Sequence, residues 1–247
     1  MSSTNKIDWC STWFNTDYYH LLYAHRNNDE AELFIKNLIL NLRIPEGAKV
    51  LDIACGKGRH ACILSKYHLK VWGIDIASNS IEEAKKNSHP AITFEVFDMR
   101  NVYKKNYFDF VFNLFTSFGY FENEQENDAT IQSISENLKK KGLLILDFLN
   151  AEFVKKNLKE NEQIIKNNIE FNITRKISKN RVVKKIQIND HGQQYLFEEN
   201  VRLYTLNELT TIFNKFGLSV IKTFGDYHLS PLNEINSPRV ILVAQKI

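Results

Sequence analysis

The segment at residues 50–60, VLDIACGKGRH, constrains the fold more than any other part of the chain. It has the pattern of a buried apolar strand that runs into a turn of small residues and then into a helix. Small residues at such a turn let the backbone approach a ligand closely, and the N-terminus of the next helix presents amide groups to that ligand. The segment therefore predicts a polar ligand within a fold that alternates strands and helices.

Apolar periodicity predicts an α/β fold with one doubly wound, mostly parallel sheet. Residues 17–42 have helical spacing, with Asp29 as a cap, and are expected to form a helical lid. The cations and the glycine of KKKG at 139–142 suit the end of a further helix. The expected strands are 49–54, 70–75, 92–97, 108–114, 143–149, 218–225 and 239–246, and the expected helices are 59–67, 79–87, 126–140 and 205–216.

After residue 149 the periodicity becomes alternating. Apolar and polar residues alternate at 169–177, 181–189 and 193–204, and turn residues separate these segments. This pattern predicts an antiparallel β insertion at about 160–204, after the fifth strand of the parallel sheet. Because proline and glycine are sparse and no linker is visible, we expect a single domain over residues 1–247.

Charge and cysteine content constrain the class of protein less sharply. The 32 Lys and Arg against 29 Asp and Glu leave a net charge of +3, too small to indicate a nucleic-acid or membrane partner. The three cysteines lack zinc-site spacing, so we expect no metal and a reducing compartment. No apolar leader begins the chain, and no stretch approaches the ~18 apolar residues of a membrane span. We therefore expect a cytoplasmic protein.

Three aspartates end successive strands of the expected sheet. Asp52, Asp75 and Asp98 follow one another at intervals of 23 residues. Ligands of doubly wound sheets bind beyond the carboxyl ends of the strands, so these carboxylates should line one crevice. A carboxylate after the second strand can accept hydrogen bonds from ribose hydroxyls, and one after the third can accept from an adenine amino group. Capping of the next helix is a common alternative for one aspartate, but not for all three.

With these residues in place, the chain resembles the class I S-adenosylmethionine-dependent methyltransferases. The likeness covers about 17–150 and 205–247 and points to the glycine and sarcosine N-methyltransferase type and related small-molecule enzymes. It implies a Rossmann-like sheet of seven strands, the last one antiparallel, and S-adenosylmethionine as the cofactor. One departure is Ala54, where the family has the first glycine of the loop, and this predicts a slightly shifted cofactor. The segments that carry the likeness are LLYAHR, VLDIACGKG, WGIDIA, FDMR, NLFTSFGYF and LLILDFLN.

The resemblance also implies a role for individual residues. The methionine part of the cofactor is expected to contact Arg26, Ala54, Cys55, Gly56, Gly58 and the carbonyl of Leu114, with Asp52 beneath the loop. The adenosine part is expected to contact Asp75, Ile76, Asp98 and Met99. A nicotinamide dehydrogenase is the nearest enzymatic alternative, since it too uses a strand, a glycine turn and a later aspartate, but it has no role for the aspartate after the third strand, Asp98.

The expected reaction is in-line displacement, in which the acceptor attacks a sulfonium methyl group that is already activated. Holding the acceptor at attack distance can lower the barrier by ~7–11 kcal/mol. A base is needed only where the acceptor must lose a proton. The candidates for that base are His60, Tyr120 and Tyr19.

The acceptor is expected to be a small molecule. The loop at 116–121, TSFGYF, is aromatic and lacks the Asn/Asp-Pro-Pro-Tyr-like sequence of many nucleic-acid and protein amide methylases of this fold. The β insertion could cover a small acceptor and exclude water. Two alternatives stay open. Ten Lys or Arg against three acids between residues 155 and 185 could bind RNA, and the chain could bind S-adenosylmethionine without catalysis. The sequence leaves the oligomeric state open.

Overall fold

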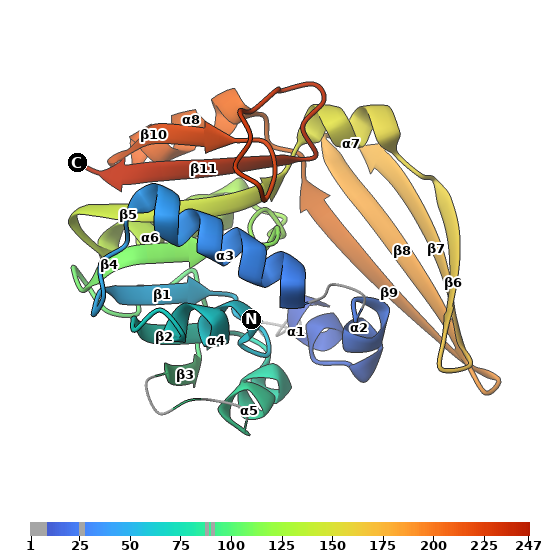
Figure 1. Ribbon diagram of the computed structural model, residues 1–247. Coiled ribbons are helices and arrows are strands. Elements are labelled where there is room, and N and C mark those ends of the chain that lie inside the picture. Colours follow the sequence, from blue (N-terminus) through green and yellow to red (C-terminus); the bar gives the residue numbers. More distant parts are fainter. Residues whose placement is uncertain (1–8, 25–27, 87–88, 90–91) are drawn as a thin grey trace, which may run out of the picture.

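The computed structural model describes residues 9–24, 28–86, 89 and 92–247 (Figure 1). The helices are α1 (Trp9–Phe14), α2 (Asp17–Leu22), α3 (Asn28–Leu42), α4 (Arg59–Ser65), α5 (Ser78–Lys86), α6 (Glu124–Asn137), α7 (Ala151–Asn157) and α8 (Leu206–Lys215). The strands are β1 (Lys49–Ile53), β2 (Lys70–Asp75), β3 (Ile92–Val96), β4 (Phe108–Asn113), β5 (Leu138–Leu149), β6 (Asn161–Lys166), β7 (Ile169–Ser178), β8 (Arg181–Asp190), β9 (Gln193–Arg202), β10 (Leu218–Phe224) and β11 (Arg239–Lys246).

Seven strands form one large sheet in the order β10-β11-β5-β4-β1-β2-β3. The five strands from β3 to β5 in this order pair in parallel, whereas β11 runs antiparallel to both of its neighbours. Strands such as β1 and β11 are nearly continuous apolar runs because helices cover both faces of the sheet. This arrangement confirms the predicted fold class.

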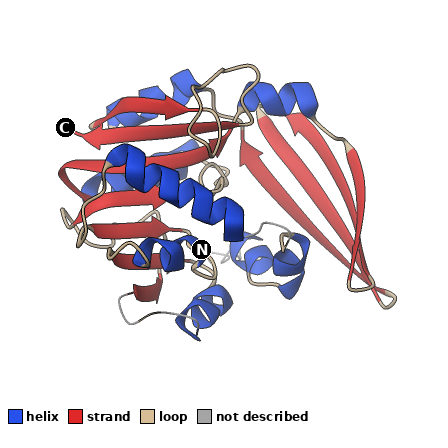
Figure 2. Cartoon of the chain, in the orientation of Figure 1, coloured by secondary structure: helices blue, strands red, loops and turns tan. Residues whose placement is uncertain are grey.

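Helices lie on both faces of the large sheet (Figure 2). The apolar side chains of α3, α4 and α5 share one core with one face, and those of α6 and α8 share a second core with the other. In α3 the buried residues are Ala31, Phe34, Ile35 and Leu38, which recur at the spacing of one helix face. The loops at the carboxyl ends of the parallel strands therefore leave the sheet between two packed layers of helices.

The predicted insertion forms a separate antiparallel sheet in the order β6-β7-β8-β9. Lys179 and Asn180 both have positive φ angles at the β7–β8 turn, as do His191 and Gly192 at the next turn, which is typical of two-residue hairpin loops. The inner face of this sheet packs against α1 and α2 in a third core (Figure 1). The sequence did not predict α1, α7 or β6.

The predicted end of the helix at 126–140 is wrong. Helix α6 stops at Asn137, and the lysines and glycine of 139–142 belong to β5. The carbonyl of Asn137 accepts a hydrogen bond from the Tyr107 amide at 3.0 Å, and Lys139 pairs with Asp109 at 2.7 Å. Contacts with β4 and the segment that precedes it therefore replace the expected capping by cations and glycine.

The region predicted as a lid, residues 17–42, divides into two helices with different surroundings. Helix α2 packs against the second sheet, whereas α3 packs against the large sheet. Thr16 caps α2, accepting a hydrogen bond from the Tyr19 amide at 3.2 Å. None of the helices within the described residues is long and apolar enough to cross a membrane.

Candidate functional site

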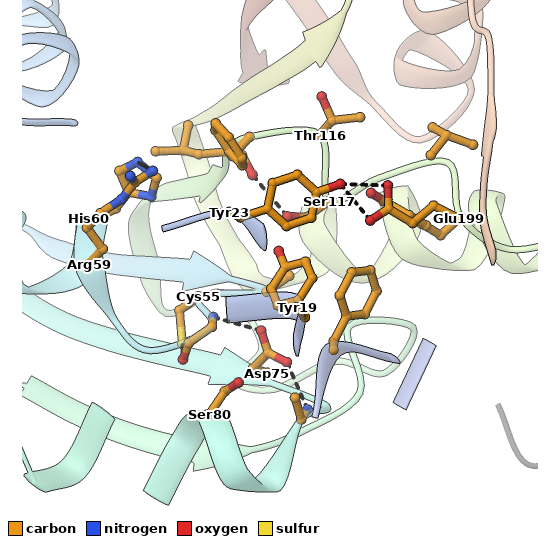
Figure 3. A pocket seen from close by; sticks show the side chains of 18 of the residues that line it. Tyr19, Tyr23, Cys55, Arg59, His60, Asp75, Ser80, Thr116, Ser117 and Glu199 are labelled. Carbon is orange, nitrogen blue, oxygen red and sulfur yellow. Dashed lines mark hydrogen bonds between the residues drawn. The ribbon is translucent and has the colours of Figure 1, made fainter. Parts of the chain in front are cut away.

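A cavity of about 950 Å³ lies between the carboxyl edge of the parallel strands and the second sheet. The loops that follow β1, β2, β3 and β4 line one side, and residues of α2, β7, β8 and β9 line the other (Figure 3). Nine of the predicted cofactor residues lie in its wall: Asp52, Ala54, Cys55, Gly56, Asp75, Ile76, Asp98, Met99 and Leu114. Arg26, another predicted contact, lies outside the described residues.

The loop after β1 is a tight turn with positive φ angles at Ala54 (59°), Gly56 (55°) and Gly58 (79°). Ala54 adopts this conformation although glycine is favoured there. A Cβ atom on Gly56 would meet nothing within 4 Å, so the loop is open to the cavity at this point. A Cβ atom on Gly58 would lie 2.4 Å from the Phe94 ring. Gly58 is therefore placed for close helix packing and does not line the cavity.

Asp52 lies beneath this loop and is 2% exposed. Its Oδ2 atom has no hydrogen-bond partner among the described residues. Burial, with a smaller contribution from the nearby Asp75, raises the pKa of Asp52 to about 7. A buried acceptor without a donor is costly, so this oxygen indicates a place for a polar or cationic ligand group.

Asp75 joins the first two loops of the site. Its Oδ2 accepts a hydrogen bond from the Gly56 amide at 2.7 Å, and its Oδ1 accepts from the Ala77 amide at 2.8 Å (Figure 3). Burial raises the pKa of Asp75. Each carboxylate oxygen can accept further hydrogen bonds, so the two backbone contacts leave room for ribose hydroxyls.

Asp98 has a second partner that the sequence analysis did not consider. The Arg100 guanidinium donates to both carboxylate oxygens of Asp98, with Nη2 2.6 Å from Oδ2, and its Nη1 lies 2.5 Å from Glu126. This pair fixes the carboxylate at the end of the cavity that Phe97 and Met99 also line.

The three predicted base candidates, His60, Tyr19 and Tyr120, all line the cavity. Burial, with a contribution from the adjacent Arg59, lowers the pKa of His60 to about 3. A base works best with a pKa near the operating pH, so His60 is poorly suited to accept a proton. The rings of Tyr19 and Tyr120 both contact Phe14, at 5.0 and 5.5 Å between centroids.

A buried charged cluster in the second sheet was missed by sequence reasoning. The Tyr23 hydroxyl shares its hydrogen between the two carboxylate oxygens of Glu199, at 2.6 and 2.8 Å (Figure 3). Glu199 also accepts a hydrogen bond from Trp13 Nε1 at 2.9 Å, and Lys184 Nζ lies 3.5 Å from its Oε2. The sequence contained a sign of this cluster, because Glu199 lies two residues from each of the apolar residues Phe197 and Val201 and therefore on the same face of the strand. A charge on the buried face of a strand indicates a function or a buried partner.

A second missed network surrounds the turn after β4. Asp147, which is 1% exposed, accepts hydrogen bonds from the Phe115 amide at 2.8 Å, from Arg239 Nε at 2.7 Å and from Tyr227 Oη at 3.1 Å. Arg239 also donates to Thr116 Oγ1 at 2.8 Å. Phe115 and Thr116 have φ angles of 67° and 58°, which are strained for these residue types. The network holds a strained turn directly after Leu114.

Comparisons with known proteins agree with this geometry. The family model described as "Methyltransferase domain" matches residues 44–217. The chain is 29% identical over 134 residues to the dTDP-3-amino-3,4,6-trideoxy-alpha-D-glucopyranose N,N-dimethyltransferase of Streptomyces venezuelae, covering 54% of this chain and 56% of that protein. It is 31% identical over 132 residues to the putative methyltransferase YqeM of Bacillus subtilis, covering 52% and 51%. The chain thus spans about half the length of these curated relatives.

Solved structures extend the likeness in fold to almost the whole chain. An S-adenosylmethionine-dependent methyltransferase from Clostridium acetobutylicum has a TM-score of 0.77 at 16% identity, covering 96% of this chain and 98% of that one. The amino pentose methyltransferase CalS10 from Micromonospora echinaspora, solved with S-adenosylmethionine bound, has a TM-score of 0.70 at 19% identity, covering 94% and 98%. The predicted resemblance is confirmed: the chain belongs to the methyltransferase domain family and has the fold of class I S-adenosylmethionine-dependent methyltransferases.

Proposed function

We propose that this protein transfers a methyl group from S-adenosylmethionine to an amino group on a sugar-like small molecule. The observation that carries this proposal is one continuous cavity of about 950 Å³, which joins the loops after the parallel strands to the second sheet. Donor and acceptor would share a space that the second sheet and α2 cover, which suits a small acceptor. The amine is suggested by the relatives that are named for methylation of amino sugars.

The residues in the cavity wall fit this cofactor. Asp52 offers a buried acceptor without a donor, Gly56 leaves its turn open, and Asp75 keeps acceptor capacity at the end of β2. Phe97 and Met99 provide apolar surface beyond Asp75 for an adenine ring. When bound, the cofactor supplies a sulfonium methyl group that is already activated for attack.

The chain's own contribution is to position the acceptor and to exclude water. The second sheet and α2 line the same cavity as Leu114 and the cofactor loops, so an acceptor amine held against them would share an enclosed space with the cofactor. Positioning of this kind can supply ~7–11 kcal/mol of barrier reduction. An amine that enters uncharged attacks without a base, which is consistent with the depressed pKa of His60.

The surroundings of the basic segment 155–185 favour a small acceptor over RNA. Lys155 pairs with Glu152 at 2.7 Å, and Lys159 and Arg175 both pair with Glu162. The Arg181 guanidinium donates to the carbonyls of Gly119, Tyr120 and Phe121. Cations engaged in this way have less charge to offer to phosphates.

The test uses methyl-labelled S-adenosylmethionine with amino-sugar acceptors and, separately, with total cellular RNA. We expect label in the amino-sugar fraction, whereas label in RNA would overturn the proposal. Binding of S-adenosylhomocysteine without transfer to any acceptor would support the non-catalytic alternative instead.

A variant pair tests the cofactor site in the same assay. Asp75→Ala removes the carboxylate that joins two loops of the site, so we expect at least a tenfold loss in S-adenosylhomocysteine affinity by calorimetry. Lys185→Ala removes an exposed cation outside the cavity and serves as the matched control. Equal losses in the two variants would contradict the site.

A further inference from the structure

Four aromatic side chains form a continuous arc in the cavity wall. Phe14 contacts Tyr19 and Tyr120, with ring centroids 5.0 and 5.5 Å apart, and Tyr19 contacts Tyr23 at 5.0 Å. All four rings line the cavity. Figure 3 shows Tyr19 between Asp75 and Tyr23, so the arc extends from the proposed ribose side toward the second sheet. We call these four residues the aromatic box.

Neighbouring rings of the aromatic box meet at steep angles, in edge-to-face or tilted contacts. The planes of Phe14 and Tyr19 are inclined by 84°, those of Phe14 and Tyr120 by 83°, and those of Tyr19 and Tyr23 by 60°. Rings in such an arrangement can direct both faces and edges toward one enclosed volume.

Residues outside the aromatic box hold its rings in position. The buried Trp13 contacts Tyr19 edge-on at 5.6 Å and Phe197 at 4.6 Å. Tyr23 is fixed by its hydroxyl, which donates to the Glu199 carboxylate and accepts from Lys184 Nζ. A cage whose walls are already positioned loses little conformational entropy when a ligand binds.

The charges around the box are compatible with a bound cation. Lys184 Nζ lies 4.5 Å from the centroid of the Tyr23 ring and donates a hydrogen bond to Tyr23 Oη, so it lies at the hydroxyl edge of the ring, and Glu199 balances its charge. Burial lowers the pKa of His20 to about 4 and that of His60 to about 3. Both histidines are therefore neutral at pH 7. The other charged side chains of the wall are the cations Lys57, Arg59, Arg175, Lys184 and Arg239 and the acids Glu30, Asp52, Asp75, Asp98, Glu199 and Asp226.

We propose that the aromatic box is a binding subsite for an N-methylated ammonium group. This inference rests on the proposed function and names its substrate class: an amine that already carries at least one methyl group. Aromatic faces attract cations through the ring quadrupole, and methylation lowers the cost of removing water from an ammonium. The box therefore favours methylated over primary ammonium groups, and the bound group must lose its proton to water before its nitrogen can attack a sulfonium methyl group.

The test is calorimetry on the protein saturated with S-adenosylhomocysteine, with choline as the probe. The comparison ligand is 3,3-dimethylbutan-1-ol, which has the same shape without the charge. We expect choline to bind at least tenfold more tightly than this neutral analogue. Equal affinities would overturn the subsite without any need for a variant.

Variants separate the ring faces from the hydroxyl groups. Tyr19→Leu should lower choline affinity at least fivefold, whereas Tyr19→Phe should keep it within twofold, because the ring remains. Tyr195→Leu, at a ring outside the cavity wall, is the matched control and should leave choline binding unchanged. Equal losses for Tyr19→Phe and Tyr19→Leu would show that the hydroxyl and not the ring binds the probe, and the subsite would be rejected.

The two proposals fail in different ways. Choline binding involves no methyl transfer, so a protein that binds choline but methylates no amine would keep the subsite and lose the proposed function. A protein that methylates an amino sugar but binds choline and its neutral analogue equally would keep the function and lose the subsite.

Discussion

At the residue scale, Asp52 should make the stability of the protein fall as the pH rises. Burial raises the pKa of Asp52 to about 7, whereas an unfolded chain has a value of about 4. The folded state therefore holds this proton more tightly. The stability that it contributes is complete below about pH 4 and is lost as the pH rises through about 7. Each pKa unit corresponds to ~1.4 kcal/mol, so the loss amounts to a few kcal/mol.

The variant Asp52→Asn tests this pH dependence because asparagine has nearly the same shape and no titrating group. Urea unfolding at pH 5 and at pH 8 would give the free energy of unfolding of both proteins. Between pH 5 and pH 8, we expect the free energy of unfolding to fall more in the wild-type protein than in the variant. Parallel profiles would mean that Asp52 titrates normally and that its burial is overcome by a partner.

Strand ends explain which site residues were predictable from the sequence. Asp52, Asp75 and Asp98 each follow an apolar run, and the carboxyl ends of parallel strands meet at one edge, so local patterns placed all three. Glu199 could not be placed in this way, because its partner Tyr23 lies 176 residues away in the chain. The sequence also did not indicate that Arg100 would pair with Asp98.

At the element scale, the turn between β4 and α6 depends on Asp147. Its carboxylate holds the strained Phe115–Thr116 turn through the Phe115 amide and through Arg239. Asp147→Asn replaces one acceptor oxygen with a donor group and removes the charge that pairs with Arg239. We expect the turn to relax and S-adenosylhomocysteine affinity to fall about tenfold by calorimetry, equivalent to ~1.4 kcal/mol.

A helix-cap variant controls for general loss of stability. Thr205 caps α8 in a reciprocal capping box with Glu208. Thr205→Ala should therefore cost ~1 kcal/mol in thermal or urea unfolding, without changing S-adenosylhomocysteine affinity. If both variants weakened ligand binding to the same degree, the effect of Asp147 would reflect lower stability and not the geometry of the turn.

Element boundaries were least predictable where tertiary contacts override local preference. The three lysines and the glycine at 139–142 suit a helix end, yet they form an irregular segment of β5 between its paired residues Leu138 and Leu143, where Lys139 pairs with Asp109. The edge strand β6 was missed for a related reason. Its sequence, NEQIIK, has an alternating burial pattern but too few apolar residues to stand out from a loop.

At the scale of the whole molecule, Glu199 joins three parts of the chain that are distant in sequence. It contacts Trp13 in α1, Tyr23 after α2 and Lys184 in β8, and it is 8% exposed. This carboxylate therefore links both N-terminal helices to the second sheet, in addition to their apolar packing against it. Removing one charge of a buried pair typically costs ~3–5 kcal/mol, because the partner is left uncompensated.

Glu199→Gln should loosen this cover while the large sheet stays folded. Glutamine can still accept from Tyr23 and Trp13, but it leaves the Lys184 ammonium without its counter-charge. We expect amide hydrogen exchange in residues 12–24 to accelerate at least tenfold, with exchange in β1 and β4 unchanged. Glu198→Gln is the matched control, since Glu198 is exposed on the neighbouring position of β9 opposite Lys185. Equal exchange in the two variants would mean that apolar packing alone holds α1 and α2 over the cavity.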